Sequence, residues 1–320
     1  MKKLSRFWFW VIKICIVVIS YSYIYYQLVY EKEKLIQWQT YDWNFKKTGF
    51  IFIVFLLMIL NWSLETVKWR ILVHPIERLA FFRSFKGIII GLTVSIFTPN
   101  RTGEYFGRIW ILSQKRIQGI FATITGSIAQ LSITLIAGII SLTFFTQEQE
   151  KNIFLYYDNY YLIILISIGL AIFIFTILFS MPQVIQKITH HKKILSFIDF
   201  IKYYSSKDII KVLLLSAMRY FIFIIQFYIL INVFDIELDF KRVFFLLALV
   251  YFAMVFIPSF TLAEIGIRGS LAIAIFSIFV LDTTGIFLAI SLLWIINIAL
   301  PAFVGSFFLL KLKLKENATA

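Results

Sequence analysis

Thr98-Pro99-Asn100-Arg101-Thr102-Gly103-Glu104-Tyr105-Phe106-Gly107-Arg108 places charges, glycines and a proline between two apolar segments. A second stretch, residues 257–269, repeats its plan near the other end of the chain. Each holds a proline and then a glutamate and an arginine four residues apart, namely Glu104 with Arg108 and Glu264 with Arg268. Charges among apolar residues are costly in a membrane and therefore mark candidate functional sites.

The composition predicts a polytopic membrane protein that forms a single integral membrane domain over residues 1–320. The chain is 61% hydrophobic and only 15% charged, whereas soluble domains carry roughly 25% charged residues. We interpret the net charge of +14 as basic cytoplasmic loops and not as a nucleic-acid surface. Cys15 is the only cysteine, and the histidines are His74, His190 and His191. We therefore expect no metal and no cofactor.

Apolar segments of about 20 residues are long enough to span a bilayer. Full spans are predicted at about 7–28, 49–71, 117–146, 160–181, 209–233 and 285–310. The first is too long for a cleaved signal peptide and should remain as a helix. Two further apolar regions, about 87–113 and 243–281, are interrupted by the two charged stretches.

The charges of the loops predict the topology. Basic residues gather at 68–86 and 182–208, whereas the connections at 147–159 and 234–242 are richer in acidic residues. The positive-inside rule then places both termini in the cytoplasm and makes each interrupted region a re-entrant hairpin. The predicted fold is thus an all-α polytopic membrane protein with about six full spans plus two re-entrant helical hairpins in an inverted-repeat arrangement.

The two charged stretches are predicted to meet near the bilayer centre, so that Arg101, Glu104 and Arg108 approach Glu264 and Arg268. Pro99 and Pro258 should end helices, and Gly103 and Gly266 should permit turns or close approach. Non-helical backbone at this depth implies a polar cavity. Its arginines could bind a phosphate through two oxygens at once. The alternative is that the charge pairs only hold the half-helices in place.

Other spans add candidate residues. Arg219 lies halfway along its span, with Gln226 on the same face, and should contact a substrate or pair with Glu104 or Glu264. In the 49–71 span, Asn61 and Glu65 share a face, and Glu65 could pair with a motif arginine. Lys68 and Arg70 are interpreted as interfacial anchors. A stripe of small and polar residues, which includes Gln130, is typical of close packing in the 117–146 span.

These motifs resemble the lysylphosphatidylglycerol synthase transmembrane-region family, which includes the membrane half of the bacterial multiple peptide resistance factor. The resemblance rests on Asn61-Trp62-x-Leu64-Glu65-x-x-Lys68-Trp69-Arg70, on Pro99-x-Arg101-x-Gly103-Glu104-x-x-x-Arg108 and on Pro258 through Gly269. It implies a stand-alone member without the aminoacyl-transferase domain, whose expected activity is lipid translocation.

The sequence therefore predicts a flippase of the bacterial inner membrane that moves a phosphate-bearing lipid between leaflets. The predicted substrate-binding residues are Arg101, Glu104, Arg108, Glu264, Arg268 and Arg219. The predicted supporting residues are Glu65, Asn61, Gln130, Pro99, Gly103, Pro258 and Gly266. The expected partner is a phospholipid or polyprenyl-phosphate lipid, with a second copy of the chain or envelope-synthesis proteins as further candidates. The alternatives are a membrane-embedded enzyme, although no catalytic or nucleotide motif is seen, and an accessory subunit in envelope lipid or glycan synthesis.

Overall fold

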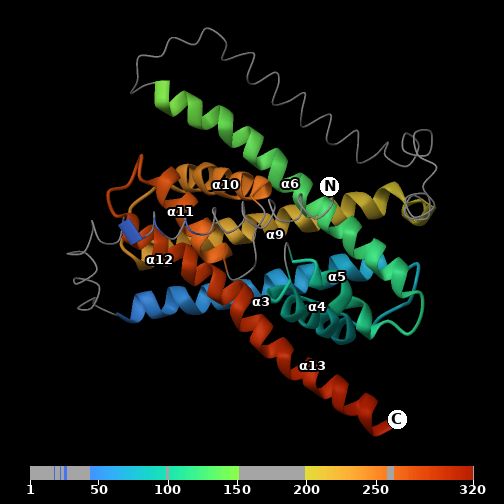
Figure 1. The fold of residues 1–320 in the computed structure, drawn as a ribbon. Coiled ribbons are helices and arrows are strands. Elements are labelled where there is room, and N and C mark those ends of the chain that lie inside the picture. The colour runs from blue at the N-terminus through green and yellow to red at the C-terminus, as the bar shows by residue number, and fades with distance from the viewer. Residues whose placement is uncertain are drawn as a thin grey trace, which may run out of the picture.

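The computed structural model describes residues 44–98, 101–150, 199–257 and 263–319, together with Val18, Ser22, Tyr25 and Tyr26. Every element in these ranges is a helix (Figure 1), so the all-α prediction is confirmed for them. Pro99, Pro258 and the predicted span at 160–181 lie outside the described residues, as does nearly all of the predicted span at 7–28.

Four long helices agree with four of the predicted spans. They are α3 (Phe45–Val73), α6 (Arg116–Glu150), α9 (Ser206–Val233) and a continuous run of α12 (Thr283–Trp294), the π-helical turn η2 (Ile295–Ala299) and α13 (Leu300–Thr319). Each contains a segment long and apolar enough to cross a membrane, at Phe45–Val73, Arg116–Leu142, Ser206–Val233 and Thr283–Leu310. The described part of the chain is therefore a multi-pass membrane protein.

Local sequence explains where the long helices begin. The Asn44 side chain accepts a hydrogen bond from the backbone N–H of Lys47 at the start of α3. Ser205 and Asp208 form a reciprocal capping box at the start of α9. Such caps satisfy backbone donors that a first helical turn leaves unpaired.

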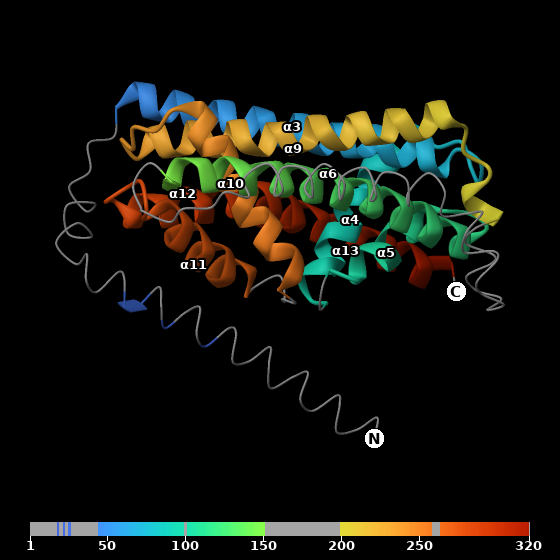
Figure 2. The ribbon, with the colours of Figure 1, turned by 90° about the horizontal axis from the view of Figure 1, so that it is seen from above.

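Helices α3 and α9 lie side by side along most of their length (Figure 2). Between them, the Gln226 side-chain amide donates to the Val54 carbonyl at 2.9 Å, and both residues are fully buried. The Trp62 indole of α3 donates to the Asn297 carbonyl of η2 at 3.1 Å. These bonds connect α3, α9 and η2, which all contribute polar residues to the site described below.

The first interrupted region folds into α4 (Phe81–Ile96), α5 (Gly103–Arg108) and the short 3₁₀ helix η1 (Ile109–Ile111), which we call the first hairpin. The chain enters and leaves it at the same end, because Arg83 Nη2 donates to the Ile111 carbonyl at 2.6 Å. A Cβ added to Gly107 would lie 2.5 Å from the Gly91 Cα. Helices α4 and α5 therefore touch backbone to backbone at these glycines.

The second interrupted region folds into α10 (Phe240–Phe256) and α11 (Glu264–Phe276), which we call the second hairpin. Its two ends also lie together, because the Arg242 guanidinium sits 5.9 Å from the centre of the Phe279 ring. Helix α10 packs on α6, where a Cβ added to Gly138 would lie 2.4 Å from the Phe252 Cβ. This glycine lets the two helices approach closely.

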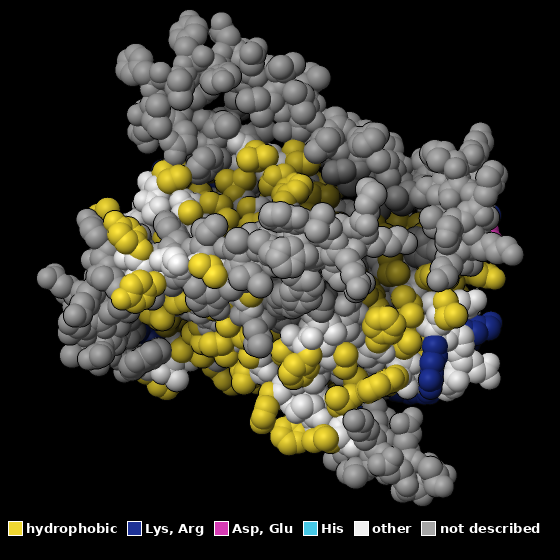
Figure 3. Space-filling view, in the orientation of Figure 1, with side chains coloured by type: hydrophobic (Ala, Val, Ile, Leu, Met, Phe, Trp, Pro, Cys, Tyr) yellow, Lys and Arg dark blue, Asp and Glu magenta, His cyan; other side chains and the backbone are white. Residues whose placement is uncertain are grey.

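The two hairpins lie toward opposite ends of the long helices (Figure 2). The end of the first hairpin also holds the Tyr204 hydroxyl, which donates to the Leu72 carbonyl at 2.5 Å. The end of the second holds the ion pair between Lys47 Nζ and Asp235 Oδ2 at 2.6 Å. Between the ends, hydrophobic side chains dominate the coloured surface, and Lys and Arg stand out mainly at the right edge of Figure 3. Such an apolar belt suits a membrane-embedded protein.

Candidate functional site

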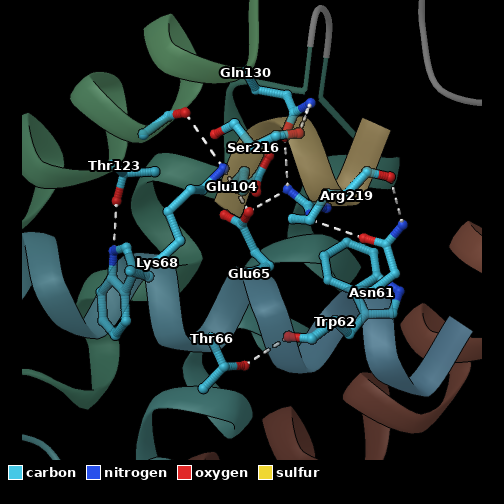
Figure 4. A network of polar contacts seen from close by, with 12 residues as sticks. Asn61, Trp62, Glu65, Thr66, Lys68, Glu104, Thr123, Gln130, Ser216 and Arg219 are labelled. Carbon is cyan, nitrogen blue, oxygen red and sulfur yellow. Dashed lines mark hydrogen bonds and ion pairs between the residues drawn. The ribbon is translucent and has the colours of Figure 1, made fainter. Parts of the chain in front are cut away.

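The carboxylate of Glu65, in the second half of α3, contacts three cations. Its Oε1 accepts from Arg108 Nη1 at 2.8 Å, and its Oε2 lies 2.7 Å from Lys68 Nζ and also accepts from Arg219 Nη1. Figure 4 shows Lys68 and Arg219 approaching this carboxylate. Glu65 is 3% exposed, and a buried charge is tolerated only when it is paired and hydrogen-bonded. Glu65 therefore ties α3, α9 and the first hairpin together.

The guanidinium of Arg219, on α9, contacts side chains of α3 and α6. Its Nε donates to Asn61 Oδ1 at 2.8 Å, and its Nη1 lies 3.3 Å from Gln130 Oε1 of α6. Its guanidinium carbon lies 5.5 Å from the centre of the Trp62 ring. Because the guanidinium is planar, these contacts fix its orientation before any ligand arrives.

The first hairpin contributes Arg101, Glu104 and Arg108. Glu104 Oε1 accepts from Arg108 Nη2, as the four-residue spacing predicts. Gly91 leaves room for Arg108, since a Cβ there would lie 2.8 Å from the Arg108 Cγ. Arg101 has a φ of 57°, which is unusual for a residue with a side chain. Its Nε is buried and has no hydrogen-bond partner in the described chain.

The second hairpin contributes Glu264 and Arg268. Arg268 Nη2 lies 3.6 Å from Glu264 Oε1, which is too long for a good hydrogen bond. Glu264 Oε2 lies 3.4 Å from the Trp294 indole nitrogen. The Arg268 guanidinium carbon lies 5.5 Å from the centre of the Tyr251 ring, and its Nε is buried without a partner in the described chain.

A cavity of about 470 Å³ brings the two hairpins and the long helices to one site. Its walls hold the cations Lys68, Arg101, Arg219 and Arg268 but only the carboxylates Glu65 and Glu104. Arg108 and Glu264 are bonded to these groups. The cluster as a whole therefore sets five cations against three carboxylates. We call this space the central cavity.

Aromatic and polar side chains complete the walls of the central cavity. They include Trp62, Tyr220, Tyr251, Ser127, Gln130 and Asn297. The hydroxyls of Tyr220 and Tyr251 and the Oδ1 of Asn297 are buried with no hydrogen-bond partner in the described residues. Leu131 and Val255 also line the cavity and are 42% and 37% exposed. Exposed apolar residues thus adjoin the charged groups.

Several predicted neighbours do lie around this cavity. Glu65 pairs with the motif arginine Arg108, as the sequence suggested. Arg101 and Glu104 of the first hairpin line the same space as Arg268 of the second. However, no ion pair joins one hairpin to the other within the described residues. Gly103 sits where a Cβ would lie 2.5 Å from the Val94 carbonyl oxygen, and Gly266 is buried in α11.

Three interpretations need correction. Lys68 is not an interfacial anchor, because it is 1% exposed and bonded to Glu65. Arg219 pairs with neither Glu104 nor Glu264, since Glu65 lies on the facing helix and takes that place. The stripe on α6 packs only in part, because its Ser127 and Gln130 line the central cavity. The sequence signal for Lys68 was its position one turn after Glu65; Tyr251 and Asn297 carried no such signal.

Comparison with known proteins gives one result. The family model described as "Lysylphosphatidylglycerol synthase TM region" matches residues 10–306. No curated protein and no solved structure matches the chain significantly. The match covers nearly all of the described residues and both hairpins, and the family is the one that the sequence motifs suggested. The chain belongs to the lysylphosphatidylglycerol synthase transmembrane-region family.

Proposed function

We propose that this protein is a flippase, which moves a phosphate-bearing lipid between leaflets by passing its headgroup through the central cavity. The observation that carries the proposal is the excess of cations over carboxylates around a cavity that residues of both hairpins line. Membership of a membrane lipid-related family supports a lipid as the ligand.

Arginine suits this task because a guanidinium can bond two phosphate oxygens at once. Moving a phosphate without partners into the hydrocarbon core would be strongly unfavourable, because it loses its hydration. Arg101 and Arg268 have buried Nε atoms that the described chain leaves without acceptors. Because these Nε atoms are enclosed, a ligand phosphate would instead accept from the terminal nitrogens of the two guanidinium groups, which line the central cavity. The exposed apolar residues Leu131 and Val255 would let the acyl chains stay in the lipid.

The arrangement of the hairpins supports access from both sides. Each begins and ends at one end of the molecule, and the two ends are opposite. We infer that both are re-entrant, that the chain has six full spans and that the basic end near Arg78, Arg83 and Lys115 faces the cytoplasm. Both termini would then be cytoplasmic. By family membership, the membrane would be the bacterial inner membrane.

Reconstitution in liposomes tests the proposal. The vesicles would contain phosphatidylglycerol with a fluorescent acyl chain in both leaflets, and an external reductant would bleach the outer leaflet. Empty vesicles should lose half of the fluorescence, whereas vesicles with the protein should lose nearly all of it. Arg101→Gln and Arg268→Gln should each slow the loss about tenfold or more, because a bond to a charged group contributes roughly 1.5–3 kcal/mol.

Arg116→Gln is the matched control, because Arg116 is exposed at the beginning of α6 and does not line the central cavity. It should move lipid at the unaltered rate. Equal rates in all three variants would contradict the role of the arginines. Recovery of a chemically altered probe, detected by mass spectrometry, would favour the membrane-embedded enzyme instead.

A further inference from the structure

We propose that a second pocket, at the end of α3, binds the phosphate group of a membrane lipid. This pocket has a volume of about 580 Å³, within the range of sites that hold small-molecule ligands. We call it the end pocket. None of the described residues that line it also lines the central cavity. It is therefore a separate site, and its proposed ligand does not depend on movement of lipid between leaflets.

The end of α3, the turn after it and the beginning of α9 form the walls of the end pocket. Val67, Arg70, Ile71 and His74 share one face at the end of α3, because the last three follow Val67 by three, four and seven residues. Figure 2 shows the end of α3 and the beginning of α9 at the same end of the molecule. The site thus lies where two spanning helices reach one surface of the membrane.

Two arginines of the end pocket have donors that no acceptor in the described chain uses. Arg70 Nε donates to the Leu79 carbonyl at 3.0 Å, which fixes the plane of its guanidinium group. Its terminal nitrogens and the guanidinium of Arg78 have no hydrogen bond or ion pair to the described residues. A phosphate suits such donors, because one guanidinium can bond two of its oxygens. His74 adds a further donor.

The described walls of the end pocket include one carboxylate, that of Asp208. Its Oδ2 accepts from the Ser205 hydroxyl at 2.7 Å and from the Ser205 backbone N–H at 3.1 Å, because Asp208 belongs to the capping box of α9. Lys211 follows it at the next turn of the same helix. Two arginines therefore share the pocket with one carboxylate that caps a helix, and the balance of fixed charge favours an anion.

The arrangement along α3 favours a lipid over a soluble phosphate. Val67 lies about 10 Å before His74 along the helix axis, since each residue adds about 1.5 Å. Val67 is 36% exposed, and Ile71 extends its apolar surface. The Arg70 side chain starts between them, but its bond to the Leu79 carbonyl shows that it reaches toward the turn. Apolar surface thus adjoins cations at the end of a span, and basic pockets in this position bind lipid headgroups.

Photochemical labelling of the full-length protein tests the site. The protein is placed in phosphatidylcholine liposomes that contain, in both leaflets, phosphatidylglycerol with a diazirine at the beginning of one acyl chain. Peptide mass spectrometry then locates the label, which we expect on residues 67–74 and on Tyr203. Arg78→Gln should reduce the label there about tenfold or more, the effect of losing one bond between charged groups. Unlabelled phosphatidylglycerol should compete with the probe, whereas glycerol phosphate, which lacks acyl chains, should not.

Arg70→Gln is the second variant and should reduce the label similarly. Arg78→Gln breaks no bond to the described residues, so thermal unfolding should confirm that it is folded. Arg116→Gln is the matched control, because it removes one exposed arginine at the beginning of α6 and does not line the end pocket. Its label should equal that of the unaltered protein.

Three outcomes would overturn the proposal. Unchanged label in both Arg70→Gln and Arg78→Gln would remove the arginines from the site. An equal loss in Arg116→Gln would show only a general attraction of the basic surface for anionic lipid. Competition by glycerol phosphate as strong as that by phosphatidylglycerol would assign the pocket to a soluble phosphate compound. Since labelling requires no movement between leaflets, a protein that fails to move lipid can still show the site.

Discussion

The two hairpins carry the same Glu-x-x-x-Arg spacing but use their arginines differently. In the first, the Arg108 guanidinium bonds Glu104 and reaches Glu65 of α3 at 2.8 Å. In the second, Arg268 has only Glu264 as an ion-pair partner among the described residues, at 3.6 Å, and lies against the Tyr251 ring. Both arginines have a buried Nε without a partner among the described residues. They differ in their terminal nitrogens, because two carboxylates bond those of Arg108 and no printed hydrogen bond reaches those of Arg268 among the described residues.

This difference shows that a local motif does not decide the role of its charges. Spacing explains why each glutamate can reach its own arginine. The third partner, Glu65, comes from a different helix and is present only beside the first hairpin. We infer that Arg108 mainly holds the first hairpin against α3, while Arg268 and Arg101 are the arginines that a ligand can use. We therefore expect the two hairpins to differ in function.

The largest expected difference between the two hairpins is in stability, and the matched substitutions Arg108→Gln and Arg268→Gln test it. Arg108→Gln removes one partner of a buried pair and should cost about 3 kcal/mol or more. Arg268→Gln should cost less, because Arg268 gives up one long contact to Glu264 at 3.6 Å, although the buried Glu264 then loses its cation and some stability is still lost. The measurement is thermal unfolding of the purified protein in detergent. Equal losses would mean that both arginines are structural.

Much of the fold could be predicted, because apolar segments of bilayer length are a strong signal. Four spans match helices of membrane-crossing length, and both interrupted regions form pairs of helices. The breaks themselves were marked by proline, glycine and charge together. How many spans and re-entrant hairpins the whole chain has stays a prediction, as does the arrangement around Pro99 and Pro258.

The site was predicted less completely, because its geometry depends on which helices face one another. Glu65 was a candidate partner for a motif arginine, and it does bond Arg108. Its simultaneous bonds to Arg219 and Lys68 require α3 and α9 to pack with these faces together, which no local pattern encodes. Lys68 looked like an anchor because lysines near span ends usually reach the interface. Here the carboxylate one turn earlier holds it inside.

The close contact between α4 and α5 holds Arg108 in place, so a substitution at this contact is a second test of its structural role. Gly107→Ala would bring a Cβ to 2.5 Å from the Gly91 Cα, which is backbone and cannot rotate away. The helices must separate, and overpacking of this kind costs about 1–3 kcal/mol. The control is Gly49→Ala, because a Cβ there meets nothing within 4 Å. It should be neutral or stabilise by up to about 1 kcal/mol. Thermal unfolding of both variants measures the difference. A Gly107→Ala variant as stable as the unaltered protein would show that the crossing tolerates a methyl group.

The smallest expected effect concerns the tyrosine beneath Arg268. The Tyr251 hydroxyl is buried without a partner in the described residues, whereas the Tyr204 hydroxyl bonds the Leu72 carbonyl at 2.5 Å. Tyr204→Phe should therefore cost about 1 kcal/mol of stability and leave lipid movement unchanged. Tyr251→Phe should cost nothing in stability but slow phosphatidylglycerol movement about two- to tenfold, the range of one hydrogen bond to a ligand. Unfolding and lipid movement are measured on the same preparations. If the second hairpin holds the ligand, Tyr204→Phe should lower only the stability and Tyr251→Phe only the rate of lipid movement. A loss of stability in Tyr251→Phe would instead mean that this hydroxyl, like Arg108, is used to hold the fold.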